Sequence, residues 1–163
     1  MTSDESTSTE ASHRMCIWVD ADACPGVVKE ILYRAANREQ TMVTFVANQM
    51  LRVPPSPWIR ALQVPSGFDV ADERIAQSVR VGDLVVTADI PLAAQIVERG
   101  AHVLDPRGIV LDEGNIQERL SVRNFLDELR SSGVETRGPN AYSSADRQRF
   151  ANSLDTFLSR HRK

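Results

Sequence analysis

In the stretch Cys16-Ile-Trp-Val-Asp-Ala-Asp-Ala-Cys-Pro25, an apolar run ends on two acids and is followed by a proline that can open a helix. A short run that is apolar at nearly every position is typical of a strand buried on both faces, as in a parallel sheet. Proline is tolerated at the first position of a helix, because the amide that it lacks would have no partner there. The stretch therefore predicts a strand, two acids at its carboxyl end, and a helix from Pro25.

The same alternation continues along the chain. Apolar runs predict strands, and amphipathic patterns predict the helices between and after them. The expected strands cover residues 16–20, 42–47, 61–64, 84–87 and 101–104, and the expected helices cover residues 25–37, 70–81, 91–99, 115–131 and 144–160. Strands that alternate with helices predict an α/β fold, in which a doubly wound, mostly parallel sheet carries helices on both faces.

The last two helices are expected to pack against the rest of the domain. The first of them has an apolar stripe that we expect to be buried, made by Leu120, Phe125, Leu126 and Leu129. The second has a stripe that includes Phe150 and Leu154, so we expect the C-terminal segment to fold back onto the sheet.

Length and composition indicate one domain. The 163 residues are 42% hydrophobic and 25% charged, which suits one globular unit over residues 15–160, and residues 1–14 are expected to be a disordered leader. No apolar run approaches the roughly 20 residues of a membrane span, so we expect a cytoplasmic protein. Cys16 and Cys24 fit neither a redox pair nor a zinc cluster, which agrees with a reducing compartment. The formal charge of −3 excludes a protein that coats nucleic acid by bulk positive charge.

Polar side chains follow several of the expected strands. Asp20 and Asp22 follow the first, Asn48 the second, Asp89 the fourth and Asp105 the fifth. Each of these residues by itself suits an ordinary turn or helix cap. In an open parallel sheet, however, the carboxyl ends of the strands meet at one edge, where ligands bind. The sequence therefore predicts an acidic rim at that edge.

Asp72 strengthens this interpretation. On an ideal helix it falls on the same stripe as Ile75, Ala76 and Val79, where a carboxylate is costly unless a metal ion or an arginine compensates it. The alternative is a first-turn acid that interacts with the helix amides and dipole. Asp69 and Glu73 flank it, so both interpretations remain open at this stage.

The side chains available for chemistry favour a hard metal ion. Of the three histidines, His102 lies within a strand pattern and the other two lie in the tails, which disfavours a histidine base or a zinc site. Cys24 precedes a helix, but a small, partly buried spacer is the better interpretation. Carboxylates together with water are the preferred ligands of Mg²⁺ and Mn²⁺, which hydrolyse phosphodiesters by activating water.

Four motifs resemble the bacterial YaiI/YqxD family. They are Trp18-Val-Asp-Ala-Asp-Ala-Cys-Pro25, Phe68-Asp-Val-Ala-Asp-Glu-Arg-Ile-Ala76, Thr87-Ala-Asp-Ile-Pro-Leu-Ala93 and Asp105-Pro-Arg-Gly108, and the resemblance extends over about residues 15–158 through Gly138-Pro139, Tyr142, Asp146-Arg147, Phe150 and Leu154-Asp155. That family is grouped with PIN-like domains, so the resemblance implies a parallel sheet of order 3-2-1-4-5 and a metal-dependent nuclease site.

The resemblance also implies roles for individual acids. Asp20, Asp72 and Asp89 resemble the acids of a PIN site that end the first strand, lie on the central helix and follow the fourth strand. A fourth acid is not fixed by the pattern, and Asp22, Glu73 and Asp105 compete for that place.

Three functions are compatible with these residues. The leading hypothesis is a Mg²⁺- or Mn²⁺-dependent phosphodiesterase or ribonuclease acting on single-stranded RNA or another phosphodiester, in which Asp20, Asp72 and Asp89 hold the ion and Asp22 is a further ligand or a water-positioning base. A second is a haloacid-dehalogenase-like phosphatase with Asp20 as nucleophile and Asp22 as general acid, although neither Lys29 nor Lys163 is well placed to hold the phosphate. A third is a non-catalytic metal- or RNA-binding module.

A last expectation concerns two arginines near the C-terminus. If the final helix docks on the sheet, Arg147 and Arg149 could approach the acidic cleft and clamp a substrate phosphate. The alternative for Arg147 is a salt bridge to a structural acid. The sequence does not predict an oligomeric state.

Overall fold

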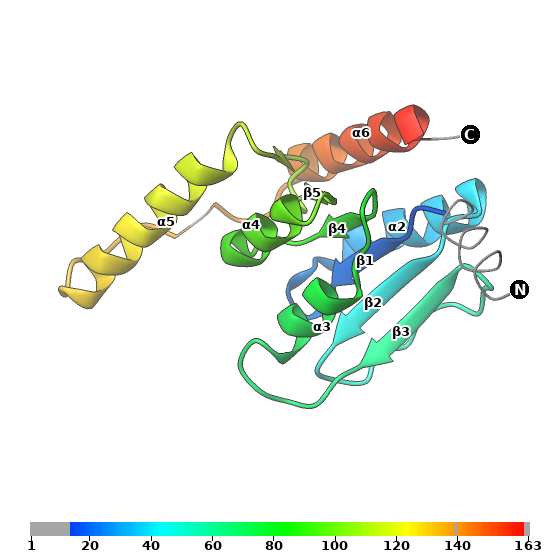
Figure 1. Cartoon of the computed structure of the whole chain (residues 1–163), viewed down its shortest axis with the longest axis horizontal. Coiled ribbons are helices and arrows are strands. Elements are labelled where there is room, and N and C mark those ends of the chain that lie inside the picture. The colour runs from blue at the N-terminus through cyan, green and yellow to red at the C-terminus, as the bar shows by residue number, and fades with distance from the viewer. Residues whose placement is uncertain (1–13, 139, 162–163) are drawn as a thin grey trace, which may run out of the picture.

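A computed structural model describes residues 14–138 and 140–161, which form one α/β unit (Figure 1). The strands are β1 (Ile17–Asp20), β2 (Val43–Ala47), β3 (Ile59–Gln63), β4 (Leu84–Val86), β5 (His102–Leu104) and β6 (Val110–Leu111). The helices are η1 (Ala21–Ala23), α2 (Gly26–Glu39), α3 (Val70–Ser78), α4 (Ile90–Glu98), α5 (Ile116–Ser131) and α6 (Ser144–His161). Apart from Arg14, the predicted leader lies outside the described residues.

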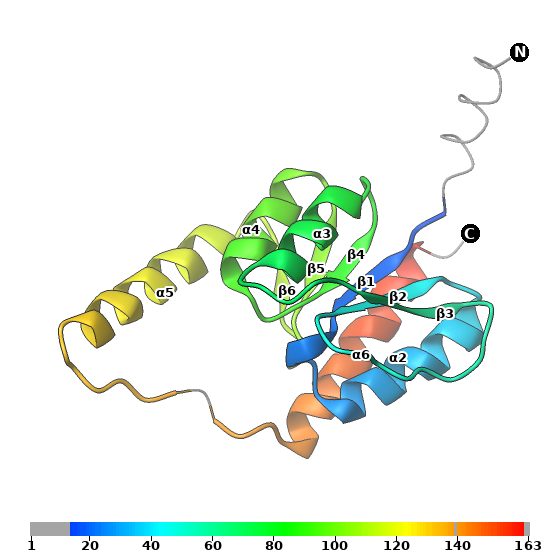
Figure 2. The ribbon, with the colours of Figure 1, turned by 90° about the horizontal axis from the view of Figure 1, so that it is seen from below.

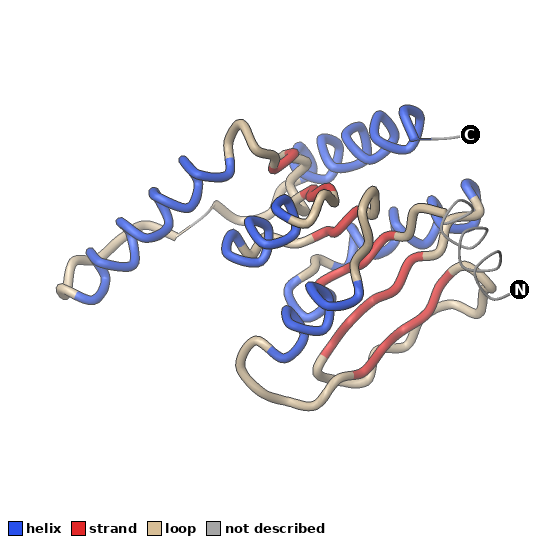
Figure 3. The backbone as a smooth tube through the Cα atoms, viewed as in Figure 1, coloured by secondary structure: helices blue, strands red, loops and turns tan. Residues whose placement is uncertain are grey.

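The strands form one sheet of order β3-β2-β1-β4-β5-β6 (Figure 3). The first five strands are parallel and follow the predicted order 3-2-1-4-5, so the predicted fold class is confirmed. The expected number of five strands is wrong, because β6 pairs antiparallel with β5 through Val103 and Leu111 and through Leu104 and Val110. A strand of two residues is too short to show the periodicity from which strands are predicted.

Helices cover both faces of the sheet (Figure 2). On one face, α2 and α6 pack side by side over Ile17, Val19 and Phe45. On the other face, α3 and α4 cover Trp18 and Val85. Because both of their faces are buried, β1, β2 and β4 are apolar at nearly every successive position, as the sequence predicted, whereas the edge strand β3 is largely exposed.

A buried carboxylate joins the strands at their amino ends. Asp83 is 1% exposed and accepts hydrogen bonds from the Cys16 amide at 3.0 Å, the Trp18 indole at 3.1 Å and the Arg80 amide at 2.9 Å. These donors stabilise the carboxylate without water. The bonds tie the start of β4 to β1.

Helix α5 departs from the sequence prediction. Its first turn packs against α4, but the helix then projects away from the sheet (Figures 1 and 2). Ile116 is its only fully buried residue, Leu120, Leu126 and Leu129 are partly buried, and Phe125 is 59% exposed, so the expected burial of the whole stripe is wrong. An amphipathic pattern shows that a helix has an apolar side but not what covers that side. No helix in the described part of the chain combines the length and apolar character of a membrane span.

The expected return of the C-terminal helix to the sheet is present. Phe150, Leu154 and Leu158 of α6 are buried in the same core as α2. The backbone of α6 also comes very close to Gly108, in the turn between β5 and β6, and Ser153 Oγ donates a 2.7 Å hydrogen bond to the Gly108 carbonyl. A Cβ atom on Gly108 would lie 2.6 Å from the carbonyl carbon of Arg149. The glycine of the Asp105-Pro-Arg-Gly108 motif therefore allows helix and turn to touch.

Gly108→Ala should destabilise the protein more than a matched glycine substitution. Gly108 has a φ of +92°, and Gly82 has a φ of +90° with no heavy atom within 4 Å of an added Cβ. Gly82→Ala measures backbone strain alone, for which we expect a loss of about 1 kcal/mol, or roughly 3 °C in melting temperature. Gly108→Ala adds the collision with α6 and should lose about 3 kcal/mol. Equal losses for the two variants, measured by thermal unfolding, would contradict the proposed close packing.

Candidate functional site

Three carboxylates meet where the strand order reverses. β1 lies between β2 and β4, so the carboxyl ends of β1 and β4 are neighbours. Asp20 ends β1, Asp89 follows β4 as the residue before α4, and Asp72 lies in the first turn of α3. The charges of Asp20 and Asp89 both raise the pKa of Asp72, so Asp72 lies within electrostatic reach of both carboxylates.

Asp72 is the most perturbed member of this carboxylate cluster. Its pKa rises from an ordinary value of 3.8 to about 7, first because of burial, then because of repulsion from Asp89 and Asp20, a hydrogen bond with Asp89 and repulsion from Asp69. A first-turn acid that only interacted with helix amides would have a lowered pKa. Burial and repulsion therefore outweigh the helix dipole at this position.

Asp20 is held in place by Thr87. The Thr87 hydroxyl, buried at the end of β4, donates a 3.0 Å hydrogen bond to Asp20 Oδ2 and accepts one of 3.0 Å from the Asp89 amide. Burial raises the pKa of Asp20, and repulsion from Asp89 and Asp22 adds to this effect, while the bond from Thr87 opposes it. Thr87 was missed as a site residue in the sequence, although a hydroxyl that ends an apolar strand beside an acidic rim was the available signal.

Asp89 is fixed by the helix that it begins. Its Oδ1 accepts a 2.9 Å hydrogen bond from the Leu92 amide, and Pro91 occupies the start of α4. This capping role accounts for one carboxylate oxygen. Asp89 also interacts with Asp72 by charge and by a side-chain hydrogen bond, so it belongs to the cluster as well as capping α4.

Asp22 and Asn48 form a second set of contacts at the carboxyl edge of the sheet, after β1 and β2. Asp22 lies exposed in η1, and its Oδ2 accepts a 2.8 Å hydrogen bond from the Asn48 amide. The Asn48 side chain donates to the Pro65 carbonyl at 3.3 Å. Asp22 also raises the pKa of Asp20, so among the three candidates for a fourth acid it is the one shown to interact with the cluster.

Glu73 and Asp105 do not join the carboxylate cluster in this structure. Glu73 is exposed and lines a groove between α3 and the end of β3. Asp105 Oδ1 accepts hydrogen bonds from the Arg107 amide at 2.8 Å and the Ile109 amide at 3.1 Å, and so forms the turn that leads to β6. Burial raises the pKa of Asp105, while these two amides oppose the rise. The interactions of Asp105 are those of a turn-forming residue.

The two arginines expected at the cleft are occupied or placed elsewhere. Arg149 pairs with Asp146, a buried acid one turn earlier on α6, which also accepts a 2.8 Å bond from Arg107. Arg147 is exposed and has no hydrogen bond or ion pair from its side chain within residues 14–138 and 140–161. Neither arginine is among the groups that shift the pKa of Asp20 or Asp72. The salt bridge expected for Arg147 is instead made by Arg107 and Arg149, because their guanidinium groups reach the buried acid.

Other nucleophiles and cations stay out of the cluster. Burial raises the pKa of the Cys24 thiol to about 12, which agrees with a spacer rather than a reactive thiolate. No cation contributes to the pKa of Asp20, and Lys163 lies outside the described residues. The structure thus offers no support for the phosphatase hypothesis, which needs a cation beside Asp20.

Comparison with known proteins identifies the family. The family model described as "Uncharacterized BCR, YaiI/YqxD family" matches residues 18–160. The chain belongs to the YaiI/YqxD family. It is 66% identical to the UPF0178 protein of Dechloromonas aromatica over 146 residues, which cover 90% of this chain and 97% of that protein. It is 60% identical to the UPF0178 protein of Paraburkholderia phytofirmans over 148 residues, which cover 91% and 90% of the two chains. No solved structure matches the chain.

The donor set of this YaiI/YqxD protein suits a hard cation, but it is not a closed coordination shell. Within the described residues, no three His, Cys, Asp or Glu side chains are gathered closely enough to hold one ion directly. Mg²⁺ keeps several waters and uses one or two carboxylates, so an open arrangement of oxygen ligands still fits it. The raised pKa of Asp72 agrees with such a site. Without a cation, a proton on Asp72 relieves the repulsion from Asp20 and Asp89, and a bound cation would relieve the same repulsion.

Replacing Asp72 by Asn should stabilise the metal-free YaiI/YqxD protein at neutral pH. The folded state binds a proton at Asp72 between pH 3.8 and about 7, while the unfolded state does not, so the contribution of Asp72 to stability falls as the pH rises through this range. The Asp72→Asn variant has no carboxyl group at this position, so it does not lose this stability as the pH rises. Because the side chain is partly solvated, we expect a gain of only about 1 kcal/mol, or roughly 3 °C, at pH 7.5.

The control for this measurement is Glu73→Gln, which changes the same charge on the exposed side of the same helix. Melting curves from pH 4 to 8 in EDTA should show the gain for Asp72→Asn above pH 6 and its disappearance near pH 4. A uniform loss of stability in Asp72→Asn across this range would contradict the repulsion inferred for the carboxylate cluster.

Proposed function

We propose that this protein is a divalent-metal-dependent nuclease or phosphodiesterase that acts on single-stranded RNA. The observation that supports the proposal is the meeting of Asp20, Asp72 and Asp89 at the point where the strand order reverses, with the pKa of Asp72 raised to about 7. Perturbed carboxyl groups at the carboxyl edge of a parallel sheet are typical of a functional site rather than of a structural ion pair.

Mg²⁺ or Mn²⁺ is the cofactor that these residues favour. All the candidate ligands are hard oxygen atoms, and none of the pKa shifts in the carboxylate cluster depends on a histidine or a thiolate. When bound, such an ion supplies an activated water and neutralises charge that develops on a phosphodiester. Asp20, Asp72 and Asp89 would hold it.

The protein supplies the positions of these groups. Thr87 holds Asp20 and the Asp89 amide, and the first turn of α4 holds one oxygen of Asp89. Asp22 is held by the Asn48 amide through Oδ2, and its Oδ1 has no hydrogen bond within the described part of the chain. That oxygen can therefore orient a water molecule or accept its proton, which is the part we assign to Asp22.

A non-catalytic module that binds metal or RNA is the second candidate. One observation favours it: in the described part of the chain, no three His, Cys, Asp or Glu side chains lie close enough together to coordinate one ion directly. Both candidates are compatible with the cytoplasmic location expected from the sequence, and they differ in turnover rather than in binding.

The decisive variant is Asp20→Asn, assayed for metal binding and RNA cleavage. The wild-type protein should bind Mn²⁺ in titration calorimetry and should cleave a labelled single-stranded RNA only when Mg²⁺ or Mn²⁺ is added. Asp20→Asn keeps the shape and can still accept a bond from Thr87 but loses the charge, so we expect at least about tenfold weaker Mn²⁺ binding and roughly 100-fold slower cleavage. Glu30→Gln, which removes an exposed acid from α2 on the opposite face of the sheet, should leave both unchanged.

Two results would contradict this assignment in different ways. If the wild-type protein binds no Mn²⁺, the metal site itself is wrong. If it binds both Mn²⁺ and RNA, and Asp20→Asn weakens the metal binding but no substrate is cut, then the non-catalytic candidate replaces the nuclease.

A further inference from the structure

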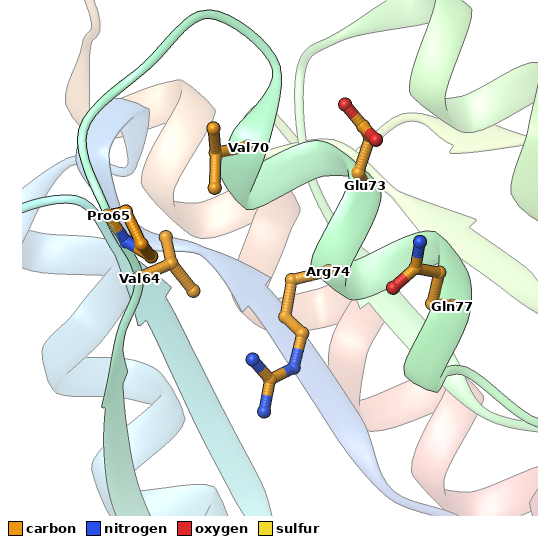
Figure 4. Close-up of a pocket in the computed structure, with 6 residues that line it drawn as sticks. All are labelled: Val64, Pro65, Val70, Glu73, Arg74 and Gln77. Carbon is orange, nitrogen blue, oxygen red and sulfur yellow. The ribbon is translucent and has the colours of Figure 1, made fainter.

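A groove opens beside the carboxylate cluster, between α3 and the end of β3. It has a volume of about 250 Å³ and is lined by Val64, Pro65, Val70, Glu73, Arg74 and Gln77 (Figure 4). This is smaller than the roughly 300–1,000 Å³ of a site that encloses a whole drug-sized ligand. The groove therefore suits one unit of a longer chain that continues beyond it in both directions.

Arg74 is the cation that lines the groove. Arg74 extends from α3 toward the strands, across the groove from Val64 and Pro65 (Figure 4). Its side chain is exposed and makes no hydrogen bond or ion pair within the described residues. Glu73 is the acid that lines the same groove, and in Figure 4 its carboxylate points away from the Arg74 guanidinium. The Arg74 guanidinium is therefore available to an anionic ligand.

A second arginine extends this surface along the sheet. Residues 60, 62 and 64 alternate onto one face of β3, so Arg60 lies on the same face as Val64, about 13 Å away along the strand. Arg60 Nε donates a 2.8 Å hydrogen bond to Thr44 Oγ1, and its guanidinium lies 6.0 Å from the centre of the Trp18 ring. These contacts hold the exposed arginine in position and leave its terminal nitrogens without a hydrogen bond among the described residues.

The groove is connected to the carboxylate cluster by two hydrogen bonds. Pro65, which lines the groove, accepts from the Asn48 side chain, and the Asn48 amide donates to Asp22. The end of the groove at Pro65 thus lies near the carboxyl edge of the sheet, where Asp22 follows β1. Asn48 connects the two parts of this surface, which gives it a positioning role.

We infer that the groove between α3 and β3 binds a segment of single-stranded RNA, with Arg74 and Arg60 holding successive parts of its phosphate backbone. Val64, Pro65 and Val70 offer an apolar surface for a base or a sugar. The inference rests on the proposed function, because the carboxylate cluster next to the groove is assigned to the cleavage of phosphodiesters. It also explains how a chain with a formal charge of −3 can bind a polyanion, since the positive charge is local.

Arg74→Gln tests the inference in a binding assay that does not require cleavage. In EDTA, binding of a fluorescent single-stranded RNA to the full chain is measured by anisotropy at several salt concentrations. Losing one phosphate contact on a single strand should reduce the slope of log affinity against log salt by about 0.7, and should weaken binding about fivefold at 0.1 M salt. Arg60→Gln should have a similar effect. The melting temperature of Arg74→Gln should not change, because the Arg74 side chain makes no hydrogen bond or ion pair in the part of the chain that the structure describes.

Arg34→Gln is the matched control, since Arg34 is an exposed arginine on α2, on the opposite face of the sheet. Equal weakening by Arg34→Gln and Arg74→Gln would overturn the groove as a site. Equally effective competition by a polyglutamate peptide and by unlabelled RNA would overturn RNA as the class of ligand. Absence of metal-dependent cleavage by the wild-type protein would reject the proposed nuclease while leaving the anisotropy result intact, so the two failures can be told apart.

Discussion

The reversal of strand order at β1 is the constraint on which the rest of the structure depends. From β1 the chain winds through β2 to β3 on one side, and the next crossover returns it to the other side, to β4. Two neighbouring strands whose helices leave in opposite directions cannot have their carboxyl ends covered by a single helix. Asp20 and Asp89 lie at this uncovered position, and α3 brings Asp72 to it from above one face.

The repulsion among these acids affects the stability of the folded chain. Carboxylates that repel one another destabilise the folded chain unless something compensates, and here the compensation is local and specific. Thr87 binds both Asp20 and the backbone of Asp89, the first turn of α4 binds Asp89, and Asn48 binds Asp22. The supporting groups fix the positions of the acids but leave most of the repulsion between them in place. A cation that bound here would relieve this repulsion, so its binding would be favoured.

Most of the fold could be predicted from local patterns, because buried strands are apolar at every position and prolines and glycines mark where helices begin and end. Asp72 could be singled out for the same reason, since helical periodicity placed it on a buried stripe. The packing of α5 could not be predicted. Phe125 has the spacing of a core residue, but spacing does not show whether another segment of the chain covers its side chain, and here it is exposed. Nor could the pairing of Arg107 with Asp146 or the close approach of Gly108 to α6, since both depend on contacts between segments that are distant in the sequence.

The contacts of Asp83 give the two edges of the sheet different local stabilities. At the amino edge, any opening would separate a buried carboxylate from the amides of Cys16 and Arg80, which is costly because a buried charge loses its donors. At the carboxyl edge, an opening would relieve repulsion among acids. The slowest amide hydrogen exchange should therefore occur at Cys16 and Arg80, through global unfolding, whereas the amides of η1 should exchange through local fluctuations. We therefore expect the sheet to open less readily at its amino edge than at its carboxyl edge, where its acids lie.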